Sequence, residues 1–243
     1  MNSVLEKSGA TNRNNTRADL SSLIQLLVDN DIMTTNFVKS ISILKSTPER
    51  NKTYSIKQET DILKYLKEND PVLLLYIQFI TYNFLRPIEV NRLKIDDLDL
   101  EGKKLFVRAK NKAVKIKIIP EIIIKEIPDI SKYNPEHFLF TATGYGMEWN
   151  TIENHKRDYF SKRFNEVVKK EFNLNKDHGL YSFRHTFITL LYRKLRETNS
   201  QQIAKSELML ITGHNTLTAL DKYLRDVDAE LPQDYSHLLQ SSE

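Results

Sequence analysis

Cysteine does not occur in this chain of 243 residues, which excludes disulfides, thiolate metal sites and cysteine nucleophiles. Glycine occurs only 6 times, and no GxGxxG or GKS/T segment is present, which excludes a glycine-rich phosphate loop. The longest apolar run, 72–85, is interrupted by Gln78 and Asn83 and falls short of the roughly 20 residues of a membrane span. The polar first 17 residues lack the apolar stretch of a signal peptide. We therefore expect a cytoplasmic protein with no membrane contact.

The usual motifs of metal enzymes and acyl-transfer enzymes are also missing. The 6 histidines show no HExxH spacing, and no calcium loop of the Asp-x-Asp-Gly kind is present. A GxSxG elbow is absent, which argues against a Ser/His/Asp hydrolase. We therefore expect neither a metal nor a cofactor. The arginine, lysine, histidine and tyrosine residues that remain suit phosphate chemistry, because a guanidinium matches two phosphate oxygens and lysine or histidine can move a proton.

Charge is distributed unevenly along the chain. Its 36 Lys and Arg exceed its 32 Asp and Glu, which gives a net charge of +4. Residues 226–243 hold five acidic residues and no Lys or Arg, so residues 1–225 carry 36 basic against 27 acidic residues, a net charge of +9. Basic clusters lie at 103–117, 156–163 and 184–196. Any single cluster is explained equally well as solvated surface, but three clusters beside an acidic tail indicate a polyanion partner.

Helical periodicity dominates the chain. Apolar residues at positions 20, 23, 24 and 27 predict an amphipathic helix over 18–29. Ser55 and Gln58 predict a capping box for a helix to about residue 68, and Asp70 with Pro71 begins a helix that is apolar on every side and hence buried. Alternating residues around a Lys/Asn/Lys turn predict a β-hairpin of 104–109 with 115–119. Further helices are predicted over 88–93, 120–126, 152–172, 181–196, 201–212 and 216–225. The predicted fold class is mainly α with one small antiparallel β-sheet.

Three segments carry reactive side chains in a particular order and spacing. Residues 84–100 read FLRPIEVNRLKIDDLDL, residues 180–192 read LYSFRHTFITLLY, and residues 208–224 read LMLITGHNTLTALDKYL. In this order they resemble the tyrosine recombinases of the phage-integrase type, in particular the integrases of bacterial mobile elements. The resemblance covers residues 54–225. It implies the catalytic-domain fold of the enzymes that break and rejoin DNA.

The resemblance implies a role for four residues. Arg86 and Arg184 match the two arginines that grip the scissile phosphate and stabilise its pentavalent transition state. Tyr223 matches the nucleophile, and because a phenol with a pKa of about 10 is weak at neutral pH, it needs neighbouring cations and a proton acceptor. His214 would hydrogen-bond the phosphate or help to take the proton of Tyr223.

The family's catalytic lysine lies in a β-hairpin turn and protonates the departing 5′ oxygen. Counting back from Pro120 without a gap gives Lys112 for this position. Lys110 is the alternative, because a shift of two residues keeps the same face of the hairpin. Glu89 is expected to orient an arginine, since a carboxylate that faced the phosphate would repel it.

One position departs from the family pattern. The family commonly has histidine three residues before the second arginine, where this chain has Tyr181. The spacing still places Tyr181 on the face of Arg184. A phenol can donate a hydrogen bond to phosphate but is a poor base at neutral pH, so the acceptor for the Tyr223 proton stays open. His185 is expected to face another direction and to brace Arg86 or Glu89.

These assignments predict four parts of the chain: a disordered segment at 1–17, the remnant of a helical core-binding domain with a linker at 18–53, the catalytic domain at 54–225, and an acidic tail at 226–243 that packs on a basic protein surface. The expected function is site-specific recombination or integration through a covalent 3′-phosphotyrosyl intermediate, independent of metal and ATP. The expected partners are double-stranded DNA, three further copies in a homotetramer on two duplexes, and accessory DNA-bending proteins. The alternatives are a nicking-closing enzyme like the type IB topoisomerases and a noncatalytic DNA-binding regulatory module.

Overall fold

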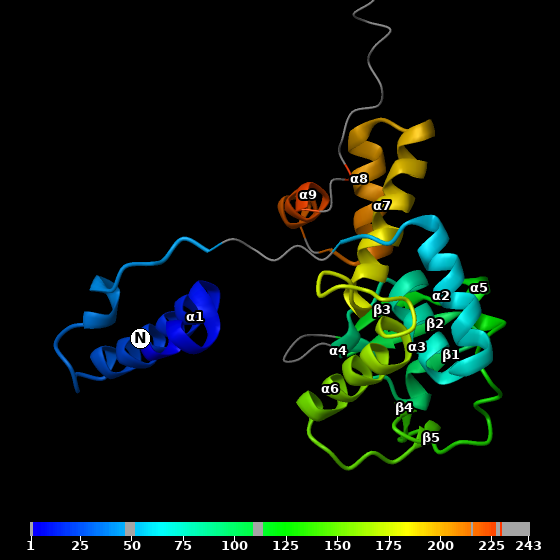
Figure 1. Ribbon diagram of the computed structural model, residues 1–243, viewed down its shortest axis with the longest axis horizontal. Helices are drawn as coiled ribbons and strands as arrows, with labels where there is room; N and C mark the ends of the chain where they lie inside the picture. The colour runs from blue at the N-terminus through cyan, green and yellow to red at the C-terminus, as the bar shows by residue number, and fades with distance from the viewer. Residues whose placement is uncertain (1, 47–51, 109–113, 215, 227–228, 230–243) are drawn as a thin grey trace, which may run out of the picture. The chain divides into compact units, whose positions relative to one another are not determined.

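The computed structural model describes residues 2–46, 52–108, 114–214, 216–226 and 229, and the chain divides into two compact units, Met1–Glu49 and Arg50–Glu243 (Figure 1). We call them the N-terminal unit and the C-terminal unit. Helices dominate both, and the described strands form small antiparallel sheets in the C-terminal unit. The expected fold class is therefore confirmed. Among the described residues, no helix has the length and apolar character needed to cross a membrane.

The N-terminal unit is built on one long helix, α1 (Asn2–Asp29), followed by the 3-10 turn η1 (Phe37–Ser40). Gly9 interrupts the helix with φ 81° and ψ 174°, a conformation that glycine adopts without a steric penalty. The prediction of a disordered segment over 1–17 is therefore wrong for residues 2–17, which are helical.

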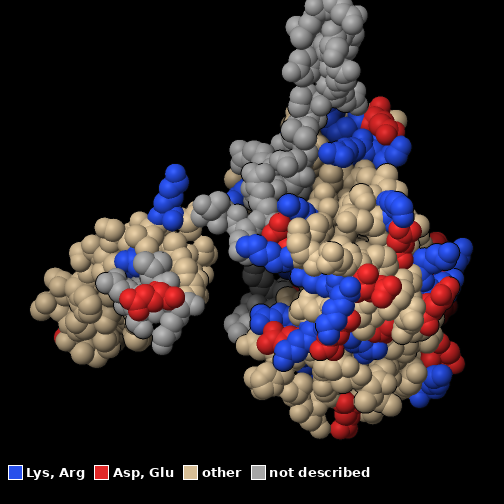
Figure 2. All heavy atoms as spheres, in the orientation of Figure 1, with Lys and Arg blue, Asp and Glu red and all other residues tan. Residues whose placement is uncertain are grey.

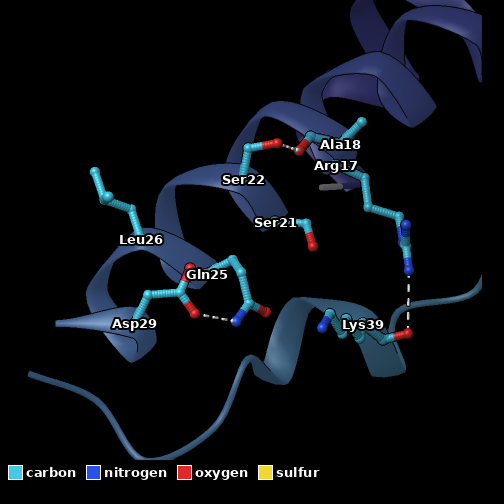
Figure 3. Close-up of a pocket in the computed structure, with 8 residues that line it drawn as sticks. All are labelled: Arg17, Ala18, Ser21, Ser22, Gln25, Leu26, Asp29 and Lys39. Carbon is cyan, nitrogen blue, oxygen red and sulfur yellow. Dashed lines mark hydrogen bonds between the residues drawn. The ribbon is translucent and has the colours of Figure 1, made fainter. Parts of the chain in front are cut away.

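Polar contacts explain why this part of α1 is ordered. Asn14 donates to the carbonyl of Leu44 (2.7 Å) and accepts from the amide N–H of the same residue (3.0 Å). Arg17 donates to the carbonyl of Lys39 (3.0 Å), and Figure 3 shows its side chain reaching from α1 to η1. Val38 is the only buried apolar residue among those described in this unit. Such contacts produce no hydrophobic periodicity, so the sequence pattern could not reveal them.

The C-terminal unit begins with α2 (Ile56–Asn69) and α3 (Pro71–Tyr82), and the capping box of Ser55 with Gln58 is confirmed. The predicted helix over 152–172 is divided, because the α-helix α6 (Glu153–Phe164) is followed by a π-helical stretch, η3 (Asn165–Lys169). The elements after α3 are, in chain order, α4 (Pro87–Val90), η2 (Ile95–Asp97), β1 (Leu98–Asp99), β2 (Lys104–Val107), β3 (Lys115–Ile118), α5 (Glu121–Ile124), β4 (Phe138–Thr141), β5 (Gly144–Met147), α6 (Glu153–Phe164), η3 (Asn165–Lys169), α7 (Leu180–Thr198), α8 (Gln201–Thr212) and α9 (Leu217–Asp226).

The larger hydrophobic cluster of this unit surrounds α3, which is buried as predicted. Asp70 caps the helix by accepting from the amide N–H of Leu73 (3.0 Å). Both carboxylate oxygens of Asp70 also accept from the guanidinium of Arg163 in α6, at 2.6 and 2.7 Å. Because a bidentate pair fixes geometry as well as charge, this contact holds α6 against the beginning of α3.

The strands form two sheets among the described residues. β1, β2 and β3 are antiparallel in that order, which confirms the predicted hairpin, although β2 ends at Val107 and residues 109–113 lie outside the described parts. β4 and β5 form a second hairpin, so the expectation of one sheet is wrong. Two of the four residues of β5 are glycines, which weaken a strand pattern. Gly146 has φ +66°, and a Cβ there would lie 2.2 Å from the ring of Tyr133.

The last three helices carry a smaller hydrophobic cluster. α7 lies beside α8, and α9 packs against α8 (Figure 1). The buried members of this cluster are Phe84, Ile188, Tyr192, Ala204, Leu208, Leu220, Leu224 and Ala229. Tyr223 is half-buried against it. The acidic tail predicted for 226–243 lies outside the described residues, apart from positions 226 and 229.

Candidate active site

The end of α3 builds the first side of the site. Asn83 follows the helix and donates through Nδ2 to the carbonyl of Ile118 in β3 (2.8 Å), which ties the helix end to the sheet. Phe84 then adopts a left-handed backbone with φ 52°, a conformation that costs roughly 1–2 kcal/mol for a residue with a side chain. Its carbonyl accepts a hydrogen bond from the guanidinium of Arg184. The strained turn before Arg86 is therefore joined directly to α7.

Arg86 precedes α4 and is held from two sides. The Glu89 carboxylate accepts from the backbone N–H of Arg86 (2.8 Å) and from its guanidinium (3.1 Å), so Glu89 orients an arginine as predicted. The Tyr181 side chain also hydrogen-bonds this guanidinium. Burial lowers the pKa of Arg86, but Glu89 and Tyr181 together raise it by more, so the net shift is upward. The group stays charged.

Arg184 projects from α7 and is almost fully buried, with 1% of its surface exposed. Burial lowers the pKa of its guanidinium, and the charge of Arg86 acts in the same direction. Its Nε has no hydrogen-bond partner among the described residues. Because a buried cation is stable only with compensating hydrogen bonds or charge, this side chain is prepared to bind an anion.

Tyr223 lies on α9 with its ring against two histidines. The ring centroids are 5.0 Å from that of His185 and 5.2 Å from that of His214. The phenol oxygen is buried and has no hydrogen-bond partner in the described part of the chain. Burial raises the pKa of Tyr223, whereas Arg184 and Arg86 lower it. The phenol is therefore neutral in the free protein, but cations that favour the phenolate are close by.

His214 follows Gly213, which ends α8 in the left-handed conformation with φ 75°. The Thr212 hydroxyl lies 2.7 Å from the Leu208 carbonyl and 2.6 Å from His214 Nδ1. Both hydrogen bonds form when the hydroxyl donates to Leu208 and accepts from Nδ1–H, which leaves a lone pair on Nε2. Burial and then the charge of Arg184, followed by Arg86 and two lysines, lower the pKa of His214 to about 4. The imidazole is neutral at pH 7.

Lysines reach the site from β3. Lys112 and Lys110, the two candidates for the catalytic lysine, lie outside the described residues. Lys115 donates through Nζ to the carbonyl of Gly213 (3.1 Å). The ammonium of Lys117 interacts electrostatically with Arg184, Glu89 and Arg86. Sequence reasoning did not select either lysine, although the KIKI alternation of 115–118 already placed them on one face.

His185 also joins the site, although the sequence predicts that it faces another direction. Its ring lies 4.7 Å from that of Tyr181 and stacks on that of Tyr223. A hydrogen bond from His185 to Arg86 or Glu89 stays a prediction.

The arrangement concentrates positive charge around one point. Four basic side chains, Arg86, Arg184, Lys115 and Lys117, face one carboxylate, that of Glu89. Because partly buried like charges repel one another, an anion is stabilised there. On the face of the C-terminal unit that Figure 2 shows, lysine and arginine alternate with aspartate and glutamate. In the described residues, no group of three His, Asp or Glu side chains is placed to hold a metal ion.

Paired arginines beside a neutral imidazole and a phenol form a site suited to binding a phosphate group. The chain belongs to the phage integrase family, whose sequence model matches residues 52–230. The resemblance to tyrosine recombinases is thereby confirmed. No curated protein matches this chain in sequence.

Solved structures with a similar fold include several integrases and recombinases. A lambda integrase dimer bound to a COC′ core site has a TM-score of 0.68 and 16% identity, covering 96% of this chain and 64% of that chain. The Tn1549 transposon integrase in complex with circular intermediate DNA has a TM-score of 0.63 and 18% identity, covering 97% of this chain and 80% of that chain. XerA recombinase has a TM-score of 0.52 and 16% identity, and the match covers 93% of this chain and 73% of the XerA chain. At these identities the likeness shows the fold alone.

Proposed function

We propose that this chain is a site-specific DNA recombinase that cleaves and rejoins DNA through a covalent 3′-phosphotyrosyl link at Tyr223. The observation that carries the proposal is the convergence of Arg86, Arg184 and His214 on the buried hydroxyl of Tyr223. Burial alone makes a phenol hard to ionise. The Tyr223 hydroxyl lies beside two guanidiniums and has no hydrogen-bond partner among the described residues. A role in attack on phosphorus explains this placement better than a role in packing.

The proposed reaction exchanges one phosphodiester bond for another. Arg86 and Arg184 bind the nonbridging oxygens of the scissile phosphate and stabilise the charge that develops in the transition state. The Tyr223 oxygen bonds to phosphorus while the bond to the 5′ oxygen breaks. The phenol proton passes to an acceptor, and the 5′ oxygen takes a proton from a lysine. The 5′ hydroxyl of a partner strand then reverses these steps, so the phosphate ester is conserved and neither ATP nor a metal is required.

His214 is the proposed acceptor of the Tyr223 proton. Its contact with Thr212 leaves the Nε2 lone pair available, and its ring is beside the phenol. Tyr181, which stands where the family commonly has histidine, hydrogen-bonds the guanidinium of Arg86. In this proposal Tyr181 positions Arg86 and contacts the phosphate, while His214 handles the proton.

The proposed source of the proton for the 5′ oxygen is the segment that joins β2 and β3 in the sequence. Lys112 is the proposed donor and Lys110 the alternative, because both belong to this segment. Lysine suits this role since its ammonium carries transferable protons on a flexible side chain. A comparison of Lys112→Met with Lys110→Met on DNA whose 5′ oxygen is replaced by sulfur assigns the donor. The variant that lacks the true donor should cleave this substrate at the rate of the natural chain, because a thiolate leaves without a proton.

Double-stranded DNA is the proposed substrate. The lambda integrase of similar fold is a dimer bound to a core site, and the Tn1549 integrase of similar fold holds circular intermediate DNA. For this chain we propose four protomers on two duplexes in the cytoplasm of its host, assisted by DNA-bending proteins. Residues 54–225 form the catalytic domain, residues 18–53 derive from a core-binding domain, and the acidic tail contacts a basic protein surface.

A pool of nicked duplexes with randomised sequence tests the proposal. The protein is incubated with the pool in EDTA, denatured, and examined for covalently bound DNA. We expect an adduct with the natural sequence, no adduct with Tyr223→Phe, and an unchanged adduct with Tyr145→Phe, because the Tyr145 hydroxyl binds the Pro71 carbonyl outside the site.

Two results would contradict the proposal. DNA binding without any adduct identifies a noncatalytic module. An adduct that is resealed on the same strand, without exchange between two duplexes, identifies a nicking-closing enzyme.

A further inference from the structure

Strand β3 turns its lysines inward. Lys115 and Lys117 lie opposite Val107 and Leu105, which are buried, so both lysines point to the core side of the sheet. The two isoleucines of the strand are 64% and 75% exposed. An alternating strand usually buries its apolar side chains, because removing an ammonium from water is costly. The inverted arrangement therefore does not serve the stability of the free protein.

Lys117 lies beside the loop that carries His214. A Cβ on Gly213 would lie 3.7 Å from Lys117 Nζ. Lys115, on the same face of β3, holds this loop by donating to the Gly213 carbonyl. Strand β3 is itself fixed by Asn83 through the carbonyl of Ile118. The strand that carries Lys117 and the loop beside it are thus both held in place.

The charges around Lys117 are mostly positive, and an anion would be stabilised among them. Arg86 and Arg184 are both close enough to disfavour its ammonium, and Glu89 is the carboxylate that favours it. With Lys115, and with Lys117 protonated, the group holds four positive charges and one negative charge. A phosphodiester would add a negative charge where these cations converge, and it would interact with each of them.

We propose that Lys117 is a ligand of the scissile phosphate, in addition to Arg86 and Arg184, and that it takes up a proton when the phosphate binds. This inference rests on the proposed function, because it adds a residue to the same site. The role is distinct from that of the lysine in the hairpin turn, which protonates the 5′ oxygen.

The state of Lys117 in the free protein explains the proton uptake. Burial and then the charge of Arg184 lower the pKa of Lys117 to about 7; Lys115 and Arg86 act in the same direction, and Glu89 opposes them. A bound phosphate raises this pKa again, because an opposite charge favours the ammonium. At about pH 8, binding is therefore coupled to protonation of Lys117. His214, with a pKa of about 4, stays outside this pH range.

Calorimetric titration measures this uptake. The full chain with Tyr223→Phe, which cannot cleave, is titrated with a mixed-sequence duplex of about 30 base pairs at about pH 8. Two buffers that differ in ionisation enthalpy report the number of protons taken up. We expect a large fraction of one proton per bound protein. The uptake is lost in Lys117→Met, and the slope of log affinity against log salt decreases by about one.

Two further variants sharpen the titration. Lys117→Arg keeps the charge but cannot lose its proton at this pH, so it restores the salt slope without restoring the uptake. Lys104→Met removes an exposed lysine from the neighbouring strand β2 and keeps the uptake. An unchanged uptake in Lys117→Met would overturn the inference.

Thermal unfolding distinguishes a phosphate ligand from a structural lysine. Because the folded pKa of Lys117, about 7, lies below its unfolded value of 10.5, the unfolded chain binds more protons in this window, and stability is lost as the pH falls through it. Lys117→Met is therefore expected to raise Tm at pH 7 and to raise it less near pH 10. A lower Tm at pH 7 would overturn the inference. If proton uptake depends on Lys117 but no DNA is ever cleaved, the proposed function fails, and Lys117 remains assigned only as a ligand of a DNA phosphate.

Discussion

The cations of the site and Tyr223, its proposed nucleophile, rest on different parts of the C-terminal unit. Arg86 follows α3, and Arg184 follows Phe183, a member of the larger hydrophobic cluster around α3. Tyr223 instead packs against the smaller cluster of α7, α8 and α9. The larger cluster also contains Leu105 of β2. The sheet that carries the lysines therefore packs on the same cluster as the segments that carry the arginines.

In the proposed reaction, this division separates the groups that bind the phosphate from the group that attacks it. The proposed phosphate ligands rest mainly on the larger cluster, and the bond from Arg184 to the carbonyl of Phe84, a buried member of the smaller cluster, links the two. Tyr223, the proposed nucleophile, depends on one short helix and a small cluster, and among the described residues no polar partner holds its hydroxyl. We expect α9 to open at a lower free energy than α3, because regions with few buried contacts open first.

The largest difference between the two regions is expected in stability. Phe79 is fully buried, with its ring 5.6 Å from that of Phe140. Phe79→Ala should lower the free energy of unfolding by about 3–5 kcal/mol, and Leu220→Ala in the smaller cluster by about 2–3 kcal/mol, because each leaves a cavity. Urea unfolding measures both. Hydrogen exchange after Leu220→Ala should accelerate in α9 and not in α3. Equal acceleration in both helices would show that the two clusters do not open independently.

The arginines should share a large effect on cleavage but differ in stability. Arg184→Lys and Arg86→Lys should each slow single-turnover cleavage about 10²–10³-fold, because an ammonium cannot replace a guanidinium fork in the transition state. Only Arg184→Lys should also lower the free energy of unfolding, since the Phe84 carbonyl loses its partner. Arg157→Lys, in an exposed pair with Asp158, is the control that should leave both unchanged. Equal stability of the two arginine variants would contradict the division.

A smaller effect is expected where the two regions meet at His214. Thr212→Val keeps the shape of the side chain but removes the hydroxyl that fixes the imidazole. We expect cleavage about 10-fold slower, which corresponds to about 1.4 kcal/mol, the usual size of one hydrogen bond. Thr212→Ser retains the hydroxyl and should cleave at nearly the normal rate. Equal rates for the valine and serine variants would show that this bond does not prepare the imidazole.

The smallest effect concerns pH. Because burial and neighbouring cations lower the pKa of His214 from 6.5 to about 4, the unfolded chain binds more protons between these values. This contribution to stability is complete above about pH 6.5 and is lost as the pH falls toward 4. His214→Gln should therefore reduce the acid sensitivity of Tm in this window. A variant with the same acid sensitivity as the natural chain would show that the imidazole is not shielded as described.

Local patterns in the sequence predicted the parts of the fold that local forces create. The capping box of Ser55, the buried helix α3 and the β2–β3 hairpin follow from nearby residues and are confirmed. The helix over 2–17 and the β4–β5 hairpin were missed, because distant polar bonds stabilise the first and glycines weaken the pattern of the second.

The site shows the same limit. Motif order identified Arg86, Tyr181, Arg184, His214 and Tyr223, which the structure brings together. It did not identify Lys117 or place His185 beside Tyr223, because those positions depend on strand register and on the packing of α9 against distant helices. A pattern of residue types does not contain such information.

The position of the covalent bond tests the central claim most directly. Tyr181 and Tyr223 both lie near the arginines, so loss of activity in one variant does not by itself identify the nucleophile. The adduct recovered from the randomised duplexes is digested with protease and nuclease, and the peptide that retains a nucleotide is sequenced by mass spectrometry. We predict that the nucleotide is linked through its 3′ phosphate to Tyr223 of the recovered peptide. A nucleotide on Tyr181, or on any other residue, would contradict the account.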